Sequence, residues 1–342
     1  MTARRTRGAS RGKRTSQASE RAAGGRFQIL AIDGGGIKGI FAAALLAGIE
    51  ADTGHRLADH FDLIAGTSTG GIIAIGLGLG LRASDLVSFY ENHGVQIFRG
   101  ERWRRVIHPF RQKYRSAPLQ AALRECFKDR PFGESQKRLI IPAYNLDSDD
   151  VYLFRTAHDQ RLARDYRLPA WQVAMATSAA PTFFGSFGGI DHMRLIDGGL
   201  WANNPALVGL VEAVTCLQVP LSEVRILSVG TTDEVPRRPK YLNSGGLIRW
   251  ARQAPDIIMR AQSIAVENQA RLLLGSANFH RVNVIVPEGA AKLDSASAVT
   301  RLLSSAANGS RKFAPSIARM FFEHIAPEFR PIHLPTGDSA AD

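Results

Sequence analysis

Two short segments of the chain carry residue types that could together cleave an ester. The first is Gly66-Thr67-Ser68-Thr69-Gly70, which directly follows the apolar stretch 61–65. A serine on a sharp turn between a strand and a helix projects its hydroxyl from the edge of the sheet, and flanking glycines such as Gly66 and Gly70 permit that turn. The pattern predicts that Ser68 is a nucleophile.

The second segment, Asp197-Gly198-Gly199, follows another apolar stretch and would hold a carboxylate on a flexible turn. Its two glycines, Gly198 and Gly199, would let the backbone approach the serine turn closely. An ordinary aspartate, with a pKa near ~3.9, is a weak base, so a working Asp197 needs partial desolvation and a direct hydrogen bond to the hydroxyl. By itself the segment is typical of an ordinary turn. Beside the serine turn, it predicts a Ser–Asp dyad that needs no histidine.

A glycine-rich loop, Asp33-Gly34-Gly35-Gly36-Ile37-Lys38-Gly39, lies between an apolar stretch and an Ala/Leu-rich stretch. Free N–H groups at the start of a helix, together with the positive end of its dipole, suit a developing oxyanion. We therefore expect this loop to supply backbone N–H groups for an oxyanion.

The same glycines also match the fingerprint of a dinucleotide-binding loop. That alternative requires an acidic residue about 20 positions further on, at the end of the next strand, to hold a ribose. Here the next strand leads into the serine turn, and the nearest acids, Glu50 and Asp52, fall on a predicted helix. An oxidoreductase stays open as an alternative that predicts nicotinamide binding.

The elements that must position these segments alternate between strands and helices. This alternation predicts an α/β fold of three layers, with a mostly parallel central sheet flanked by helices. We expect strands at 27–32, 61–65, 139–144, 151–154, 224–229 and 280–286, and helices at 39–52, from 70, 84–94, 116–127, 170–178, 205–216 and 256–274, with two more within 297–324.

Charge is unevenly distributed along the chain. Of the net charge of +12, residues 1–26 contribute eight Lys or Arg against Glu20 alone. We expect 1–26 to be a disordered basic tail, 27–335 one catalytic domain and 336–342 a second loose end. Attraction of the tail to anionic lipid or nucleic acid is the alternative to a merely solvated arm. The longest apolar run is too short to cross a bilayer at ~20 residues, and there is no secretory signal, so we expect a cytoplasmic, peripheral protein.

Taken together, these motifs resemble the patatin-like phospholipases. The resemblance rests on the glycine loop, the serine turn, Ala176-Thr177-Ser178-Ala179-Ala180-Pro181, and Asp197-Gly198-Gly199 with Asn203-Asn204-Pro205, in the family's order and spacing. It implies lipid acyl hydrolase activity from a Ser68–Asp197 dyad and an oxyanion hole formed by the backbone of Gly34, Gly35 and Gly36, with Lys38 and Gly39 supporting the loop. Since no set of metal ligands is visible in the sequence, we expect no required cofactor or metal. It also implies that the Ser178–Pro181 stretch lines the acyl side of the site.

Within that family, the chain most resembles bacterial effectors that cleave membrane phospholipids when a cyclic dinucleotide such as 3',3'-cGAMP binds them. These effectors belong to cyclic-oligonucleotide antiphage defence systems. The resemblance implies a cyclic dinucleotide ligand and action at the inner face of the cell membrane. A homo-oligomer stays open, because the sequence does not show the oligomeric state. No decisive activation motif is visible, so a constitutive lipase of the same fold stays an alternative.

Residues 98–115 form the most basic internal stretch, with seven Lys or Arg against Glu101 and with aromatic residues between them. Guanidinium groups beside aromatic rings suit lipid phosphates, an interfacial membrane face or a nucleotide base. A solvated connector between two helices is the plain alternative. The residues concerned are Arg99, Arg102, Trp103, Arg104 and Arg105.

Two further classes of protein remain as alternatives. An ordinary α/β-hydrolase would use Ser, Asp and His in that order, with His280, His324 or His333 completing a triad. A non-catalytic lipid or nucleotide sensor would bind a ligand without releasing fatty acid. No histidine or cysteine spacing predicts a metal site.

Overall fold

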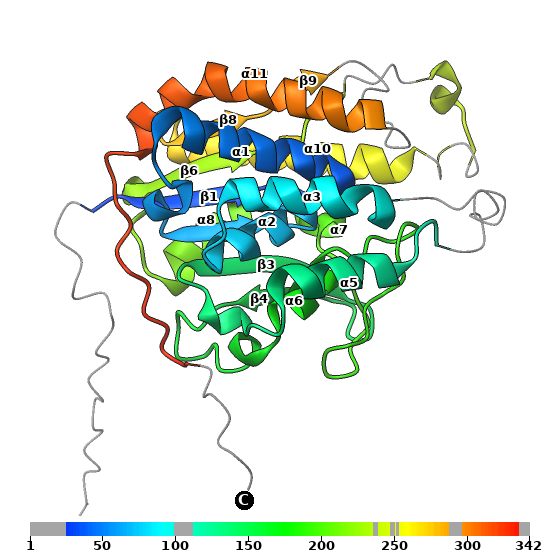
Figure 1. Ribbon diagram of the computed structural model, residues 1–342, viewed down its shortest axis with the longest axis horizontal. Helices are drawn as coiled ribbons and strands as arrows, with labels where there is room; N and C mark the ends of the chain where they lie inside the picture. The colour runs from blue at the N-terminus through cyan, green and yellow to red at the C-terminus, as the bar shows by residue number, and fades with distance from the viewer. Residues whose placement is uncertain are drawn as a thin grey trace, which may run out of the picture.

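The computed structural model describes residues 25–98, 112–234, 239–246, 250, 253–286 and 296–334. Its centre is a seven-stranded sheet in the order β4-β3-β2-β1-β6-β8, with β5 paired to β3 (Figure 1). The five strands β8, β6, β1, β2 and β3 run parallel, whereas β4 and β5 pair antiparallel with β3. The strands are β1 (Phe27–Ile32), β2 (Leu63–Gly66), β3 (Arg138–Asn145), β4 (Asp150–Arg155), β5 (Leu195–Asp197), β6 (Val224–Val229) and β8 (Phe279–Val282).

The central strand β1 shows why this sheet needs a helical layer on each face. All six of its residues are buried. Leu30 and Ile32 belong to one apolar core, and Ile29 and Ala31 belong to the other. Because successive side chains of a strand point to opposite faces, an entirely apolar strand must be covered on both sides. The predicted three-layer α/β fold is therefore confirmed.

Helices of the two layers come from different parts of the chain. One core is closed by α1 (Gly39–Thr53), α2 (Thr69–Gly78), α3 (Ala83–Ile97), α5 (Ser116–Phe127), α6 (Ala170–Thr177) and α11 (Ala296–Phe321), and the other by α8 (Ala206–Val211), its π-helical continuation η6 (Glu212–Cys216) and α10 (Ala254–Leu274). The short helices of the described residues are η2 (Gly36–Lys38), η3 (Leu57–His60), η4 (Phe132–Glu134), η5 (Asp165–Arg167), α7 (Gly199–Ala202), η7 (Leu221–Glu223) and η8 (Lys240–Asn243).

Two sequence-based expectations about these elements are wrong. The region 297–324 holds one helix, α11, rather than two, and Pro315 lies inside it. Pro315 has no N–H to donate to the carbonyl of Arg311, four residues earlier in the helix. Because Pro315 and Arg311 are both exposed, this carbonyl lies on the solvent side, where water can hydrogen-bond it. The expected strand 280–286 is split into β8 and β9 (Ile285–Val286), and β9 pairs with β7 (Asp233–Glu234) in a separate small sheet.

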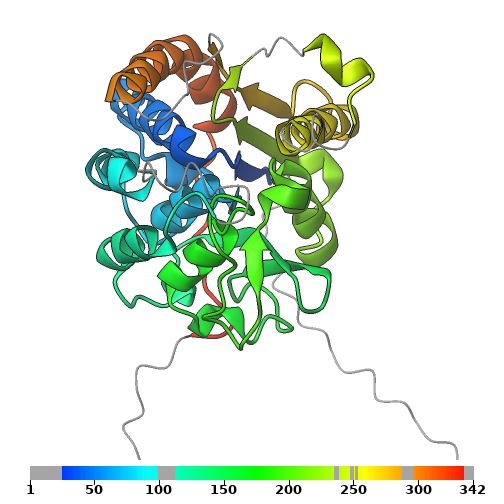
Figure 2. The same ribbon diagram turned by 90° about the vertical axis from the view of Figure 1, so that its right-hand side faces the viewer.

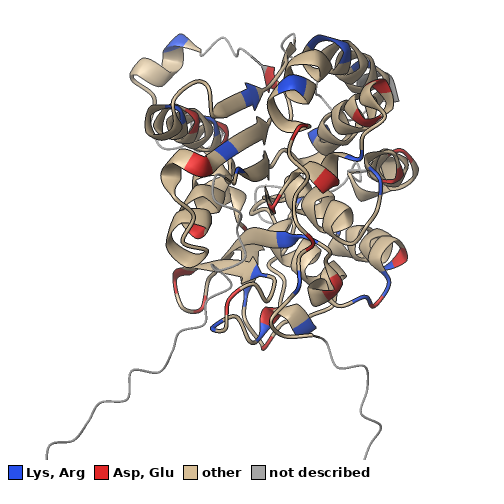
Figure 3. Ribbon diagram, turned by 90° about the vertical axis from the view of Figure 1, so that its left-hand side faces the viewer, with Lys and Arg blue, Asp and Glu red and all other residues tan. Residues whose placement is uncertain are grey.

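The carboxyl ends of the parallel strands define one edge of the molecule, which we call the catalytic edge. The helices α1 and α10 both begin there, at the right of Figure 1, and Figure 2 turns this edge toward the viewer. On the opposite edge, Lys and Arg are interspersed with Asp and Glu (Figure 3). Within the described residues, no helix combines the length and the apolar character needed to span a bilayer.

Candidate active site

The serine turn connects the end of β2 to the start of α2. Ser68 has φ 55° and ψ −123°, a backbone conformation that L-residues rarely adopt. A Cβ on Gly66 would lie 2.2 Å from the Gly70 carbonyl oxygen, and one on Gly70 would lie 2.2 Å from the Ile32 carbonyl oxygen. Neither position has room for a side chain, so the two glycines allow the tight turn that the sequence predicts.

Asp197 reaches the serine turn from the antiparallel strand β5. It is paired with Ala143 on β3, and a Cβ on the next residue, Gly198, would lie 2.3 Å from the Pro142 carbonyl oxygen. The Asp197 carboxylate is close enough to the Ser68 hydroxyl for that hydroxyl to lower its pKa, and its Oδ1 accepts a hydrogen bond of 2.7 Å from the Gly199 N–H. Only 6% of Asp197 and 8% of Ser68 is exposed. The two predicted residues therefore meet, side chain to side chain, in a largely dry place.

Burial changes the acid–base chemistry of Asp197. Desolvation of the carboxylate raises its pKa from 3.8 to about 6, and the Ser68 hydroxyl and the Gly199 N–H only partly oppose that rise. A carboxylate with a pKa near 6 is a better proton acceptor than an exposed aspartate and is still ionised at neutral pH. Asp197 is thus desolvated beside the Ser68 hydroxyl, as a working base at this position must be.

The threonines around Ser68 fix the turn. The Ser68 N–H donates to Thr177 Oγ1 at 3.0 Å, and the Thr177 hydroxyl donates to the Pro142 carbonyl at 2.6 Å. Thr67 Oγ1 donates to the Ala202 carbonyl at 2.6 Å. Thr177 thereby connects the serine turn to β3, which also holds β5 and its aspartate. Thr177 belongs to the Ala176–Pro181 motif, but its contact with the Ser68 N–H has no signal in the sequence.

The glycine loop lies beside the serine, but its three N–H groups are not equivalent. Gly34 donates its N–H to the Asn203 carbonyl oxygen at 2.9 Å, so this group is not free for an oxyanion, and the expectation for Gly34 needs that correction. Among the hydrogen bonds of the described residues, none is donated by the N–H of Gly35 or Gly36. A Cβ on Gly34 would lie 3.3 Å from Ser68 Cβ, which places the loop against the nucleophile.

The supporting positions Lys38 and Gly39 have different environments. Lys38 ends η2, is half-buried and donates its N–H to the Gly35 carbonyl at 3.2 Å. A Cβ on Gly39 would lie 1.9 Å from Thr69 Oγ1 and 2.8 Å from the Tyr90 hydroxyl, which hydrogen-bond each other. Gly39 therefore allows α1 to pack directly against the start of α2.

The dinucleotide-binding alternative has no acid in the required position. The buried Glu50 lies on α1, and its carboxylate accepts hydrogen bonds from the N–H groups of Leu57 at 2.9 Å and Ala83 at 3.2 Å. Both oxygens therefore already bind the backbone of other segments. Asp52 is also on α1, and it is exposed.

An ion pair that the sequence did not suggest supports the glycine loop from below. Arg281 on β8 contacts both carboxylate oxygens of Asp33, at 2.5 and 2.9 Å, and also donates to Ser228 Oγ at 2.7 Å. Both partners are almost completely buried. Burial raises the pKa of the Asp33 carboxyl, although the Arg281 charge acts in the opposite direction. The two residues are 248 positions apart, so no local pattern could reveal the contact.

None of the three histidines proposed for a triad makes a hydrogen bond to Ser68 or Asp197 in the described part of the chain. His324 Nε2 lies 2.8 Å from Asp62 Oδ2, and His333 Nε2 lies 3.3 Å from the Gln160 carbonyl oxygen. His280 is on β8, where burial lowers its pKa. The geometry gives no support to the triad.

The basic residues Arg99, Arg102, Trp103, Arg104 and Arg105 lie outside the described residues. The residues on either side of that stretch meet near the glycine loop. Phe98 packs its ring against Tyr114 and Phe184, with ring centroids 5.6 and 6.2 Å away. A Cβ on Gly36 would lie 3.8 Å from Phe98. An aromatic cluster therefore borders the glycine loop on the side of the Ser178–Pro181 stretch.

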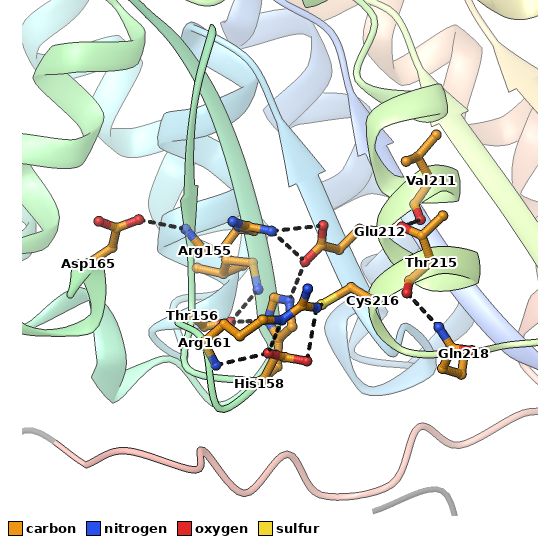
Figure 4. Close-up of polar contacts among 12 residues, drawn as sticks. Arg155, Thr156, His158, Arg161, Asp165, Val211, Glu212, Thr215, Cys216 and Gln218 are labelled. Atoms are coloured by element: carbon orange, nitrogen blue, oxygen red, sulfur yellow. Dashed lines mark hydrogen bonds and ion pairs between the residues drawn. The ribbon is translucent and has the colours of Figure 1, made fainter. Parts of the chain in front are cut away.

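A second polar cluster, which sequence spacing did not reveal, lies between the end of β4 and η6 (Figure 4). A ring nitrogen of His158, a carboxylate oxygen of Glu212 and the Cys216 sulfur all lie within 4.8 Å of one another, a donor set that could hold a metal ion. The π-helix η6 places Glu212 and Cys216 on one side, facing the end of β4.

This second cluster already has cationic partners. Arg155 Nη1 lies 3.4 Å from both Glu212 oxygens, and Arg161 Nη2 lies 3.6 Å from Cys216 Sγ. Burial raises the pKa of the Cys216 thiol to about 12, which keeps it protonated at neutral pH. The His158 ring bonds Glu212 directly at 2.8 Å. We therefore interpret the cluster as a structural polar network that joins β4 to η6.

Comparison with known proteins gives a consistent result. A family model described as patatin-like phospholipase matches residues 30–210. A cGAMP-activated phospholipase of Pseudomonas aeruginosa is 34% identical over 267 residues, which cover 77% of this chain and 80% of that protein. One of Vibrio cholerae is 34% identical over 324 residues, covering 84% and 90% of the two chains. A cUMP-AMP-activated phospholipase of Escherichia coli is 30% identical over 213 residues, covering 59% and 64%.

Proposed function

The chain belongs to the patatin-like phospholipase family of lipid acyl hydrolases, and we propose that it cleaves acyl esters of glycerophospholipids with Ser68 and Asp197 as its catalytic dyad. The observation that carries this proposal is the contact between the Ser68 hydroxyl and the buried Asp197 carboxylate, whose pKa is raised to about 6. A nucleophile and a base in direct contact are the minimum that acyl transfer through a covalent intermediate needs.

In the proposed reaction, Ser68 Oγ attacks the ester carbonyl carbon while Asp197 accepts the hydroxyl proton. The carbonyl oxygen becomes an oxyanion and accepts hydrogen bonds from the N–H groups of Gly35 and Gly36. When the tetrahedral intermediate collapses, the lysolipid oxygen leaves and takes the proton back from Asp197. Water then attacks the acyl-serine with Asp197 again as the base, which releases the fatty acid and restores Ser68.

For the acyl chain, we propose the side of the site bordered by Phe98, Tyr114 and Phe184. The rings of these residues contact one another, and the residues lie between the glycine loop and the Ser178–Pro181 stretch. An apolar aromatic lining suits a fatty acyl chain because each buried methylene contributes about 0.8 kcal/mol.

We further propose that a cyclic dinucleotide of the cGAMP class activates the enzyme. Two relatives that span 77% and 84% of this chain are called cGAMP-activated phospholipases, and a third is called cUMP-AMP-activated. These names support a cyclic dinucleotide as the class of ligand and leave its bases open. The corresponding role is degradation of the membrane from its cytoplasmic side in antiphage defence. We assign catalysis to one domain over 27–335, flanked by 1–26 and 336–342. A homo-oligomer stays a prediction.

The test is fatty-acid release from phospholipid vesicles by the wild type and by Ser68→Ala, each with and without a panel of cyclic dinucleotides. We expect release only by the wild type and only with one class of nucleotide. Release by the wild type without nucleotide would retain the phospholipase and remove the activation step. Release by Ser68→Ala equal to that of the wild type would contradict the proposed dyad.

A further inference from the structure

We infer that six exposed apolar side chains at the catalytic edge form the surface that docks on a phospholipid bilayer. This inference rests on the proposed phospholipase function. We call these residues the apolar rim; they are Leu200, Tyr241, Trp250, Ile258, Met259 and Ile285. Each is at least 36% exposed, and Leu200, Ile258 and Ile285 are exposed by 49%, 54% and 70%.

Side-chain contacts hold the elements of the apolar rim together. Asn203, just after α7, donates from Nδ2 to Ser263 Oγ on α10 at 3.0 Å. Arg260 on α10 forms an ion pair of 2.5 Å with Asp233 on β7, and Asp233 is the strand partner of Ile285. The rim therefore extends from α7 across the start of α10 to the small β7–β9 sheet, with η8 on the same edge (Figure 2). The Trp250 carbonyl accepts the N–H of Gln253, the residue just before α10, at 2.9 Å.

The location of Ser68 determines which edge must meet the lipid. Ser68 is 8% exposed, at the carboxyl end of β2, and the α7 helix that carries Leu200 directly follows the catalytic Asp197 turn. An acyl ester is embedded just below the headgroups of a bilayer, so this edge has to approach the membrane before the ester can reach the serine. An apolar rim around the entrance would replace the water that otherwise separates the protein from the lipid.

The composition of the apolar rim also fits a membrane interface. Trp and Tyr side chains favour the headgroup level of a bilayer, and Leu, Ile and Met gain free energy by leaving water for the acyl boundary. Lys240, next to Tyr241, is exposed on the same short helix. A cation beside interfacial aromatic residues favours anionic lipid, as does the net charge of +12 on the whole chain.

The far end of α10 provides both a competing explanation and a control. Leu272 and Leu273 are 85% and 55% exposed, but they lie at the opposite end of the helix from Ile258. If the exposed side chains of α10 bound a second copy of the chain, both ends of the helix would contribute to that contact. If the helix docks on a bilayer through the catalytic edge, only the Ile258 end would contribute.

The experiment measures binding without hydrolysis. In a Ser68→Ala background, the pair Trp250→Ser and Ile258→Ser is compared with the matched pair Leu272→Ser and Leu273→Ser. Each protein is sedimented with vesicles of phosphatidylethanolamine and phosphatidylglycerol, with and without 3',3'-cGAMP. We expect the rim pair to weaken partition onto vesicles about tenfold or more, and the control pair to bind like the parent.

Two further readouts separate the possible outcomes. With Ser68 restored, both pairs should hydrolyse a monomeric short-chain ester at the parent rate, because neither pair touches the dyad. If no protein hydrolyses any ester, the proposed function fails while the vesicle result still tests the rim. Docking is overturned if the rim pair binds vesicles as well as the parent does. It is also overturned if both pairs lower the oligomeric mass, which would assign α10 to a contact between copies.

Discussion

The Asp33 carboxylate and the Arg281 guanidinium form a bidentate ion pair directly beneath the glycine loop, with contacts of 2.5 and 2.9 Å. Asp33 is the first residue after β1, and Arg281 is on β8, two strands away across the sheet. The pair therefore connects the start of the proposed oxyanion loop to a strand that carries neither Ser68 nor Asp197. The Nε atom of Arg281 also lies 3.8 Å from a carboxylate oxygen of Glu267 on α10.

Breaking this pair from one side should destabilise the fold. Arg281→Met leaves the buried Asp33 charge without its cation, a change that typically costs about 3–5 kcal/mol of unfolding free energy. The double variant Asp33→Asn with Arg281→Met removes both charges and should recover part of that loss. Urea denaturation of the four proteins forms a double-mutant cycle. A loss below about 1 kcal/mol for Arg281→Met would show that the pair contributes little.

The backbone conformation of Ser68 predicts a difference between two inactive variants. Ser68→Ala and Ser68→Gly both remove the nucleophile, and each should lower ester hydrolysis by at least about 10³-fold. Ser68→Gly should, however, be more stable than Ser68→Ala by about 1 kcal/mol, because glycine adopts φ 55°, ψ −123° without strain. Thermal unfolding with activity assays on the same samples measures both effects. Equal stability of the two variants would mean that the turn is not strained.

The raised pKa of Asp197 predicts the pH dependence of catalysis. Asp197 accepts a proton only as the carboxylate, so the proportion of active enzyme falls once the pH drops below about 6. We expect kcat/KM on a neutral short-chain ester to be level above pH 7 and to decrease about tenfold per unit well below pH 6. Asp197→Asn should lose about 10³-fold or more at every pH. A profile that stays level down to pH 4.5 would exclude Asp197 as the titrating base.

Stability provides an independent control on the same pKa. Because folding raises the pKa of Asp197, its contribution to stability is fully present below its unfolded value of 3.8 and is lost as the pH rises through about 6. The rise in the pKa of Asp197 from 3.8 to about 6 corresponds to roughly 3 kcal/mol of unfolding free energy. Asp197→Asn, which buries no charge, should therefore be more stable than the wild type at pH 8. The two should be similar near pH 4.

The sequence was sufficient to predict that Ser68 and Asp197 lie together, because both are embedded in local patterns. Glycines flank Ser68 on both sides and follow Asp197, and the structure has no space for a side chain at Gly66, Gly70 or Gly198. A position that requires glycine can be recognised from a single sequence, because the glycine itself stands there. The parallel core was predictable for a similar reason, because β1 and β6 are nearly continuous apolar runs.

What the sequence could not predict depends on contacts between distant segments. The Gly34 N–H donates to the Asn203 carbonyl. Since every residue has a backbone carbonyl, the residue type at position 203 cannot reveal this acceptor. Arg281 meets Asp33 only because β8 and β1 lie on either side of β6. The π-helix at Glu212–Cys216 replaces the end of an expected α-helix, and helical periodicity alone does not distinguish the two.

The histidine alternative can be tested in one protein. A variant with His280, His324 and His333 all replaced by alanine should keep ester hydrolysis within about threefold of the wild type, because none of their observed hydrogen bonds joins the dyad. Some stability should be lost, since His324 is bonded to the buried Asp62. Activity is therefore compared at a temperature where circular dichroism shows all proteins folded. A loss of several orders of magnitude would restore a triad.

The contact between Gly34 and Asn203 allows the glycine loop to be tested without substituting either residue of the proposed dyad. In Gly34→Ala, the new Cβ would lie 2.6 Å from Asn203 Oδ1, so either the loop or the Asn203 side chain must move. Displacing Gly35 and Gly36 from the oxyanion by about 1 Å would lower kcat by about 10²-fold, with a smaller effect on KM.

Asn203→Ala gives this experiment its control. It removes Oδ1 but keeps the backbone carbonyl that accepts the Gly34 N–H. Its own cost should be small, because it loses mainly the bond to Ser263 on α10. The double variant should therefore recover most of the activity that Gly34→Ala loses, leaving only the 3.3 Å approach to Ser68 Cβ to be accommodated. If the double variant is as slow as Gly34→Ala, the clash with Asn203 is not the cause, and crowding of Ser68 itself becomes the explanation.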